Sequence, residues 1–171
     1  MPDRPIRVLF VCLGNICRSP VAEGVFRRLV EARGLAEHFE IVSAGTGPWH
    51  VGDPPDPRMT AAAKKRGTDL SDLRGRQLAR PDLAGDEAFD HVFVMDKSNL
   101  HDALALDPDG DHGTRVRLFR EFDPEPGDYQ VPDPYYGGAD GFEGVIDIVE
   151  RTAAAILDRL VAIYDLEEDA A

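Results

Sequence analysis

The stretch from Val8 to Pro20 constrains the fold of this chain more than any other. Val8 to Val11 is a short apolar run of β-branched and aromatic residues, which predicts a buried strand. Ser19 followed by Pro20 predicts the start of a helix, with the hydroxyl as N-cap and the proline at the first helical position. The seven residues from Cys12 to Arg18 therefore form a loop between a strand and a helix N-terminus.

This loop is suited to bind an oxyanion. Successive backbone N–H groups at a helix N-terminus form a concave anion site, and Arg18 can add a planar fork for two phosphate oxygens. The same positive field favours the thiolate form of Cys12, which is the nucleophilic form. Taken alone, Cys12 could be a small buried residue and Arg18 a surface charge. The Cys-x5-Arg-Ser spacing between a strand and a helix favours a phosphatase site instead.

Composition limits the fold and the partners. A chain of 171 residues with 43% apolar side chains predicts one domain, and both cysteines, Cys12 and Cys17, lie in the loop, so no disulfide framework is expected. A net charge of −13 argues against nucleic acid and requires phosphate attraction to be local to the loop. No apolar run is long enough to cross a bilayer and Met1 to Pro5 lacks signal-peptide features, which predicts a cytoplasmic protein without membrane contact.

No metal or other cofactor is expected. The acidic turn at 107–113 resembles the start of a calcium loop, but His112 and Leu118 stand where that loop requires glycine and glutamate. The histidines and cysteines show no zinc-ligand spacing. We interpret the turn as a solvated surface feature.

Apolar periodicity and turn residues predict strands that alternate with helices. The strands are expected at 8–11, 39–42, 91–95 and 115–119, and the helices at 20–33, 57–66, 97–106 and 140–164. This alternation predicts an α/β domain of three layers, with a four-stranded parallel sheet flanked by helices and its ligand site at the carboxyl ends of the strands. We expect the domain at 1–164, with Asp140 capping the last helix, and a frayed acidic tail at 165–171.

Several segments match one known family. They are Cys12 to Pro20, Ser43-Ala44-Gly45, Trp49, Met95 to Leu100, and the Asp-Pro-Tyr-Tyr-Gly segment from Asp133 to Gly137. At these residues the chain resembles the low-molecular-weight protein tyrosine phosphatases, over about residues 5–164. The resemblance implies hydrolysis of phosphotyrosine in proteins and of small aryl phosphates, by a monomer that also binds phosphate and other oxyanions.

The resemblance also implies the catalytic roles. Cys12 is the nucleophile, Arg18 clamps the phosphate, and Asp133 is the general acid and base. The phosphate-binding residues are then Leu13, Gly14, Asn15, Ile16, Cys17 and Arg18. By the family pattern, Ser19 donates a hydrogen bond to the thiolate and Ser43 supports Asn15, although both Asn15 and Ser43 could be simple turn or strand-end residues.

In the family, the positions of Trp49, His50, Tyr135 and Tyr136 flank a slot for a flat aromatic ring, although scattered surface aromatics would be the simpler interpretation of these residues alone. Ile16 is apolar where relatives that act on phosphoarginine have threonine, which favours phosphotyrosine.

Cys17 could capture an oxidised Cys12 as a disulfide, which makes redox regulation a further expectation. Two departures stand against the resemblance. Leu73 replaces a histidine that many relatives carry, and the turn at 107–113 is not a family feature.

Three other functions stay open. An arsenate reductase on the same fold needs redox cysteines outside the loop, which this chain lacks. A phosphoarginine phosphatase would share the loop. An inactive phosphopeptide-binding module would not need Cys12, Arg18 and Asp133 together.

Overall fold

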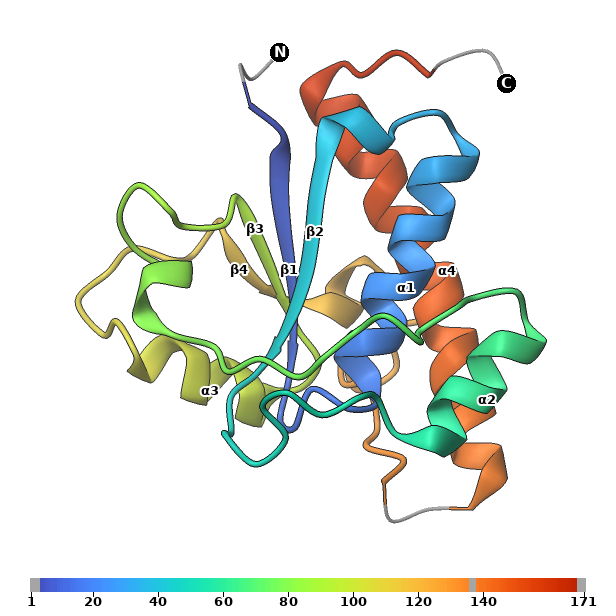
Figure 1. Ribbon diagram of the computed structural model, residues 1–171. Helices are drawn as coiled ribbons and strands as arrows, with labels where there is room; N and C mark the ends of the chain where they lie inside the picture. The colour runs from blue at the N-terminus through green and yellow to red at the C-terminus, as the bar shows by residue number, and fades with distance from the viewer. Residues whose placement is uncertain (1–3, 136–137, 169–171) are drawn as a thin grey trace.

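A parallel sheet of four strands forms the centre of the molecule. The computed structural model describes residues 4–135 and 138–168 (Figure 1). The strands are β1 (Ile6–Cys12), β2 (Phe39–Gly45), β3 (His91–Val94) and β4 (Val116–Leu118). They lie in the order β2-β1-β3-β4, and every pairing is parallel. The predicted four-stranded parallel sheet is confirmed.

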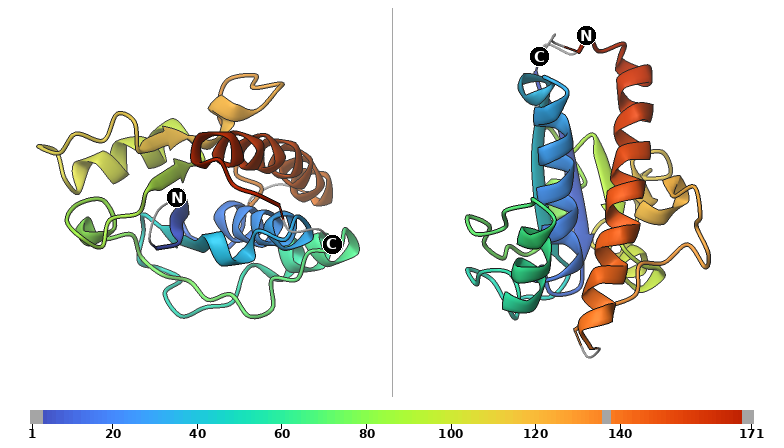
Figure 2. Two further views of the ribbon diagram at one scale, coloured as in Figure 1. Left: turned by 90° about the horizontal axis from the view of Figure 1, so that it is seen from above. Right: turned by 90° about the vertical axis from the view of Figure 1, so that its right-hand side faces the viewer.

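Helices cover both faces of this sheet. They are α1 (Arg18–Ala32), α2 (Pro57–Lys65), α3 (Lys97–Ala105) and α4 (Ala139–Tyr164), with 3-10 turns η1 (Ala36–His38), η2 (Arg80–Asp82) and η3 (Phe119–Phe122). α1, α2 and α4 lie on one side of the strands and α3 on the other (Figure 1). α4 runs beside α1 (Figure 2, right). The α/β architecture with two helical layers is therefore confirmed.

The side chains of β1 explain why both faces need a cover. Val8, Phe10 and Cys12 face the core cluster that contains α1 and α4, while Leu9 and Val11 face the cluster that contains α3. Side chains of a strand alternate between its faces, and all five of these are buried. A strand that is apolar on both faces is typical of the interior of a parallel sheet.

The last helix, α4, buries one apolar face against the core. Its fully covered members are Phe142, Val145, Ile146, Val149, Ala153, Ile156, Leu157 and Leu160, while Val161 and Tyr164 are half-buried. Within residues 4–135 and 138–168, the structure has no helix both long enough and apolar enough to pass through a membrane.

Two helix starts differ from the prediction. α1 begins at Arg18, and Cys17 takes the N-cap position without a side-chain cap. Ser19 therefore lies inside the first turn, where its hydroxyl is directed to Cys12 instead. Asp140 also lies inside its helix, because Gly138 is the N-cap of α4. Its carboxylate still stabilises the helix, because it lies in the first turn, at the positive end of the helix dipole.

The predicted tail begins too early. Leu166 is buried in the main core cluster, and Arg33 donates to the Glu168 carboxylate at 2.6 Å. Residues 165–168 therefore pack on the domain, because an apolar side chain and an ion pair both follow the end of α4. Residues 169–171 of the predicted tail lie outside the described part of the chain.

The carboxyl ends of the strands lie at the lower edge of the sheet in Figure 1. β1 ends there at Cys12, and β2 continues past its predicted end to Gly45, beside Cys12 in the register. Parallel strands bring the loops that follow them to one edge. The loops after β1 and β2 therefore meet where the sequence predicts a ligand site.

Candidate active site

The loop after β1 is held open by hydrogen bonds to its carbonyl groups. Thr46 N–H donates to the carbonyl of Cys12 at 2.9 Å, and Gly47 N–H donates to that of Leu13 at 2.9 Å. The carbonyl of Ile16 accepts from the backbone N–H of Asp56 at 2.8 Å. In a planar trans peptide the N–H points opposite to the C=O, so the next N–H groups turn inward. Inward N–H groups beside a helix start are suited to an oxyanion.

Gly45 is required by the closeness of this loop. A Cβ at that position would lie 2.8 Å from the carbonyl oxygen of Leu13 and 3.1 Å from the backbone nitrogen of Asn15. Asn15 itself has a φ of 57°, in the left-handed region that asparagine tolerates better than most residues. The loop therefore needs a small residue behind it and a tolerant residue at its tip.

The amide of Asn15 is oriented by its partners. Its Oδ1 accepts from the backbone N–H of Arg76 at 3.0 Å, a group that can only donate. Its Nδ2 donates to Ser19 Oγ at 2.8 Å and to Ser43 Oγ at 3.0 Å. Leu73, which replaces a histidine that many relatives carry, packs against the core. The partner of Asn15 Oδ1 is the backbone N–H of Arg76, which the sequence did not reveal. The structure thus joins Asn15, Ser19 and Ser43, which the sequence singled out separately.

Ser43 is in turn directed by a buried carboxylate. Its hydroxyl donates to Glu23 Oε1 at 2.6 Å, and Glu23 is 7% exposed. Because a carboxylate only accepts, the oxygen of Ser43 is left to accept from Asn15. Glu23 is a supporting residue that sequence reasoning missed, although its place in α1, one turn after Ser19, is a signal that could have found it.

Two donors face the sulfur of Cys12. The backbone N–H of Asn15 lies 3.3 Å from Sγ, and Ser19 Oγ lies 3.0 Å from it. Ser19 Oγ accepts from Asn15 Nδ2, and its one proton has two acceptors in reach, the sulfur at 3.0 Å and the carbonyl of Ala44 at 3.4 Å, of which the sulfur is the nearer. Cys12 is 3% exposed at the end of β1. Both groups are placed to donate hydrogen bonds to a thiolate sulfur.

The guanidinium of Arg18 is buried and fixed along one edge. Its Nη1 donates to Asp96 Oδ2 at 2.7 Å and to the carbonyl of Val131 at 3.0 Å, while Nη2 lies 3.6 Å from Asp133 Oδ2. Burial opposes the charge, but negative charge at Cys12, Asp96 and Asp133 outweighs it and raises the pKa of Arg18 above its ordinary value. The side chain is therefore a permanent, preoriented cation.

Asp96 was not predicted as a site residue. Its Oδ1 accepts the backbone N–H of Asn99 at 2.8 Å, so it caps α3 while its other oxygen holds Arg18. The available signal was its N-cap position in the Met95 to Leu100 segment. The carbonyl of Val131 carried no signal, because any residue provides one.

Asp133 lies on the opposite rim of the site. Its Oδ1 accepts the backbone N–H of Tyr135 at 3.0 Å, and its side chain is 38% exposed. Oδ2 faces Arg18 across the opening. The carboxyl group can therefore reach both a bound ligand and water.

A cavity of about 310 Å³ opens between these groups. It is lined by Cys12, Leu13, Gly14, Ile16, Cys17, Arg18, Trp49, His50, Asp133 and Tyr135, all of them predicted site residues. Asn15, Ser19 and Ser43 do not line it. The predicted pocket residue Tyr136 lies outside the described residues.

The rim of the cavity combines aromatic and charged side chains. Trp49 is 67% exposed and its ring lies directly over Gly47, where a Cβ would come within 2.0 Å. The Arg58 guanidinium lies 5.6 Å from the ring centre of Tyr135. His50 Nδ1 lies 3.2 Å from Asp53. An opening bordered by two exposed rings is suited to a flat ligand.

Cys17 lines the same cavity as Cys12, and both are free thiols. Burial, with nearby Asp56 and Cys12 acting in the same direction, raises the pKa of the Cys17 thiol. Cys17 therefore stays protonated in the reduced site.

Among the described residues, no group of three or more His, Cys, Asp or Glu side chains is placed to hold a metal ion. In the acidic turn, Asp107 pairs with Arg80 at 3.3 Å and with His112 at 3.2 Å. These contacts give the turn a structural explanation.

Known proteins resemble this chain along most of its length. The sequence model of the family described as low molecular weight phosphotyrosine protein phosphatase matches residues 7–165. The low molecular weight phosphotyrosine protein phosphatase of Schizosaccharomyces pombe is 49% identical over 138 residues, which is 80% of this chain and 85% of that protein.

Solved structures are also similar. A protein tyrosine phosphatase from Entamoeba histolytica, with Hepes in its active site, superimposes with a TM-score of 0.85 at 35% identity, over 94% of this chain and 99% of that one. A Drosophila arginine phosphatase gives a TM-score of 0.78 at 32% identity, over 90% and 96% of the two chains.

Proposed function

The chain belongs to the low molecular weight phosphotyrosine protein phosphatase family, and from that membership we propose that it hydrolyses phosphotyrosine through a cysteinyl-phosphate intermediate. The observation that carries the proposal is the cavity with Cys12 at its base and Arg18 and Asp133 at its sides. These groups supply a nucleophile, a phosphate clamp and an acid within one opening.

In the first step the Cys12 thiolate attacks phosphorus in line with the leaving oxygen. The inward N–H groups of the loop and Arg18 hold the three equatorial oxygens, where charge accumulates. Protonated Asp133 gives its proton to the leaving phenolate oxygen, so tyrosine departs neutral. The sulfur–phosphorus bond forms as the oxygen–phosphorus bond breaks.

In the second step water replaces Cys12. Asp133, now a carboxylate, takes a proton from the water that attacks phosphorus. The sulfur–phosphorus bond breaks, and the thiolate is stabilised again by the Asn15 N–H and the Ser19 hydroxyl. Inorganic phosphate leaves the loop, and Asp133 is protonated for the next cycle.

The substrate preference follows from the rim. Trp49 and Tyr135 would border the ring of a phosphotyrosine, and Ile16 adds an apolar wall. One related structure is that of an arginine phosphatase, so phosphoarginine is the specific alternative. Phosphotyrosine peptides should have the higher kcat/KM of the two, and the reverse order would reassign the substrate.

The covalent step is tested with the Cys12→Ser variant. We expect turnover of an aryl phosphate by the wild type in the presence of a chelator, and a fall of at least about 10³-fold in kcat for the variant. The variant should still bind inorganic phosphate, because its loop and Arg18 are intact. Calorimetry with phosphate measures the binding, and acid-quenched mass spectrometry detects the phosphocysteine of the wild type.

Appreciable hydrolysis by Cys12→Ser would contradict a covalent mechanism. If the variant loses both turnover and phosphate binding, the substitution disrupts the loop. The cytoplasmic location, the monomeric state and redox control of Cys12 by Cys17 are further parts of the proposal, supported by the sequence.

A further inference from the structure

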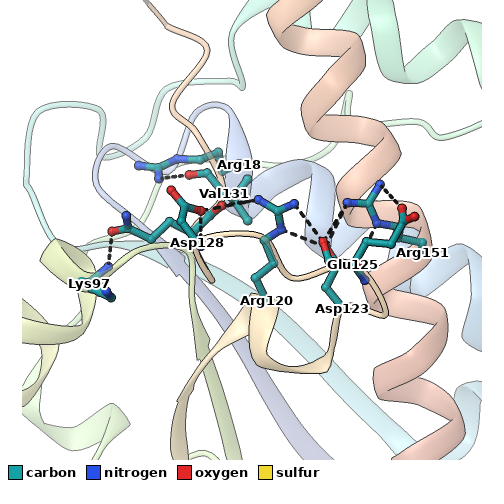
Figure 3. Close-up of polar contacts among 9 residues, drawn as sticks. Arg18, Lys97, Arg120, Asp123, Glu125, Asp128, Val131 and Arg151 are labelled. Atoms are coloured by element: carbon teal, nitrogen blue, oxygen red, sulfur yellow. Dashed lines mark hydrogen bonds and ion pairs between the residues drawn. The ribbon is translucent and has the colours of Figure 1, made fainter.

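Arg120 of η3 is surrounded by the loop that leads to Asp133 (Figure 3). Its Nε donates to Asp123 Oδ2 at 2.8 Å, its Nη1 to the carbonyl of Gln130 at 2.7 Å, and its Nη2 to the carbonyl of Glu125 at 3.1 Å. The side chain is 13% exposed. All three guanidinium nitrogens therefore hold parts of one loop.

The near end of this loop is anchored to the long helix. The side chain of Asp123 is fully buried and accepts from Arg151 of α4 at 2.7 and 3.1 Å (Figure 3). Burial alone would raise the pKa of Asp123, but donors from Arg151, the Glu125 N–H and Arg120 outweigh it and lower the pKa. Asp123 is thus a fixed anion to which Arg120 is attached.

The far end of the loop reaches the active site. Val131 follows Gln130 directly, and its N–H donates to the carbonyl of Met95 at 2.8 Å. The carbonyl of Val131 accepts from Arg18 at 3.0 Å. The contact of Arg120 with Gln130 is therefore one residue from the contact with Arg18 and three residues from Asp133.

Packing does little to hold this segment. Of residues 124–133, all of which are described, only Val131 is buried. A second cavity, of about 290 Å³, lies beside the segment and is lined by Asp96, Arg120, Asp128, Gln130, Val131, Pro132 and Asp133. With open space on that side, polar contacts constrain the path of the chain. Arg120 provides two of them, and others are those of Val131 and of the backbone N–H of Lys97, which donates to Gln130 Oε1 at 3.1 Å.

We propose that Arg120 is a positioning residue for proton transfer. By holding the carbonyls of Glu125 and Gln130, it sets the path of residues 125–133 and places the Asp133 carboxyl over the bound phosphate ester. Arg120 touches neither substrate nor phosphate and acts through Asp133. The inference rests on the proposed function, in which Asp133 is the general acid.

The test compares Arg120→Met with wild type on aryl phosphates of graded leaving-group pKa and on a phosphotyrosine peptide. A misplaced acid slows the first step only for leaving groups that need a proton, so kcat/KM, which reports that step, should fall about 10- to 100-fold for the peptide. The kcat/KM for activated aryl phosphates and the inhibition constant of inorganic phosphate should both change little. Methionine keeps most of the volume of the side chain without its donors.

Two further variants separate positioning from folding. In an Asp133→Ala background, Arg120→Met should cause no additional loss, because the group through which it acts is absent. Arg117→Met is the matched control, since Arg117 is a neighbouring arginine that donates to Glu121 at 2.9 and 2.6 Å. This variant should leave the turnover of all substrates unchanged. If Arg120→Met fails to fold, Arg120→Lys keeps the charge with fewer donors and should show a smaller loss of the same kind.

An equal loss across all leaving groups, weakened phosphate binding, or a further loss in the Asp133→Ala background would overturn the inference. If Asp133→Ala itself shows no leaving-group dependence, the general-acid assignment and this inference both fail. If Asp133→Ala shows it and the Arg120 variants do not, only the role of Arg120 is excluded.

Discussion

At the level of single residues, the side chain of Asp133 is placed by one short local contact and one longer one. The backbone N–H of Tyr135 donates to its Oδ1 at 3.0 Å, and its Oδ2 lies 3.6 Å from Arg18. The carboxyl group is thus near the phosphate site without being locked in a close ion pair. This arrangement leaves it able to exchange a proton with a ligand or with water.

The Asp133→Ala variant should distinguish substrates by their leaving groups. We expect kcat/KM, which reports the first step, to fall by about 10²- to 10⁴-fold for phosphotyrosine, the usual contribution of a general acid, and much less for activated aryl phosphates. The measurement is the slope of log kcat/KM against leaving-group pKa. Asp109→Ala, in the acidic turn, serves as control. A uniform loss would show that Asp133 is structural.

Cys17 gives the site a second thiol within the same cavity as the nucleophile. When peroxide oxidises Cys12 to a sulfenic acid, Cys17 can attack it to form a disulfide and release water. Burial, with Asp56 and the charge of Cys12 acting in the same direction, raises the pKa of Cys17 in the reduced site, so the thiol must lose its proton as it attacks.

We therefore expect wild-type activity to recover with dithiothreitol after peroxide treatment, while Cys17→Ser recovers only in part. In the variant, Cys12 proceeds to the irreversible sulfinic and sulfonic acids. Activity before and after reduction, with mass spectrometry of the loop peptide, measures this. Equal and complete recovery of both proteins would exclude protection by Cys17.

At the level of elements, the start of β3 and the end of α4 meet through one pair. His91 Nε2 lies 2.7 Å from the hydroxyl of Tyr164, and the His91 ring is stacked 6.2 Å from Phe93. Burial, assisted by Arg115 and opposed by Asp90, lowers the pKa of His91 below its ordinary value of 6.5. The folded protein therefore binds a proton at this site less readily than the unfolded chain does.

The half-buried His91 should make stability depend on pH. Below pH 6.5 the unfolded chain takes up the proton first, so the His91 contribution is present above that pH and is lost as pH falls toward the folded pKa. Urea unfolding at pH 7 and pH 5 should show a larger loss for the wild type than for His91→Phe. Tyr164→Phe keeps the histidine and should keep the pH dependence. Identical pH dependence in wild type and His91→Phe would contradict the assignment.

The elements also show where local rules fail. Gly67 ends α2 close to the predicted boundary, with a φ of 87°. Ser19 and Asp140, by contrast, were predicted as caps and lie inside their helices. Ser19 lies in the first turn because its hydroxyl there contacts the sulfur of Cys12 and accepts from the amide of Asn15. A cap and a buried hydrogen bond each contribute about 1 kcal/mol, so the two buried contacts of Ser19 together outweigh a single cap.

At the level of the whole molecule, a net charge of −13 surrounds a site that must attract phosphate. The attraction comes from within the fold. Arg18 is 3% exposed and is neutralised along one edge by Asp96, while the remaining edge and the loop N–H groups face the cavity. A local positive site in a negative molecule acts over a few ångströms, because solvent screens the rest.

Much of this organisation is determined by the sequence alone. The apolar runs and turn residues predicted the four strands and the helices, because hydrophobic periodicity and turn chemistry act over a few neighbouring residues. The spacing from Cys12 to Arg18 predicted the loop, since a strand end and a helix start determine its shape locally. The cavity residues of the loop follow from this segment, whereas Trp49, His50, Asp133 and Tyr135 were expected from the family resemblance.

Only the tertiary structure decided which groups support them. Arg18 and the carbonyl of Val131 are 113 residues apart in the chain, and Asn15 and the N–H of Arg76 are 61 apart. The Val131 carbonyl and the Arg76 N–H are backbone groups of a kind found along the whole chain, so no side-chain pattern marks them. Glu23, Asp96 and Arg120 acquire their roles in the same way, because the parallel sheet brings the segments that follow its strands to one edge, and only that packing selects which polar groups meet there.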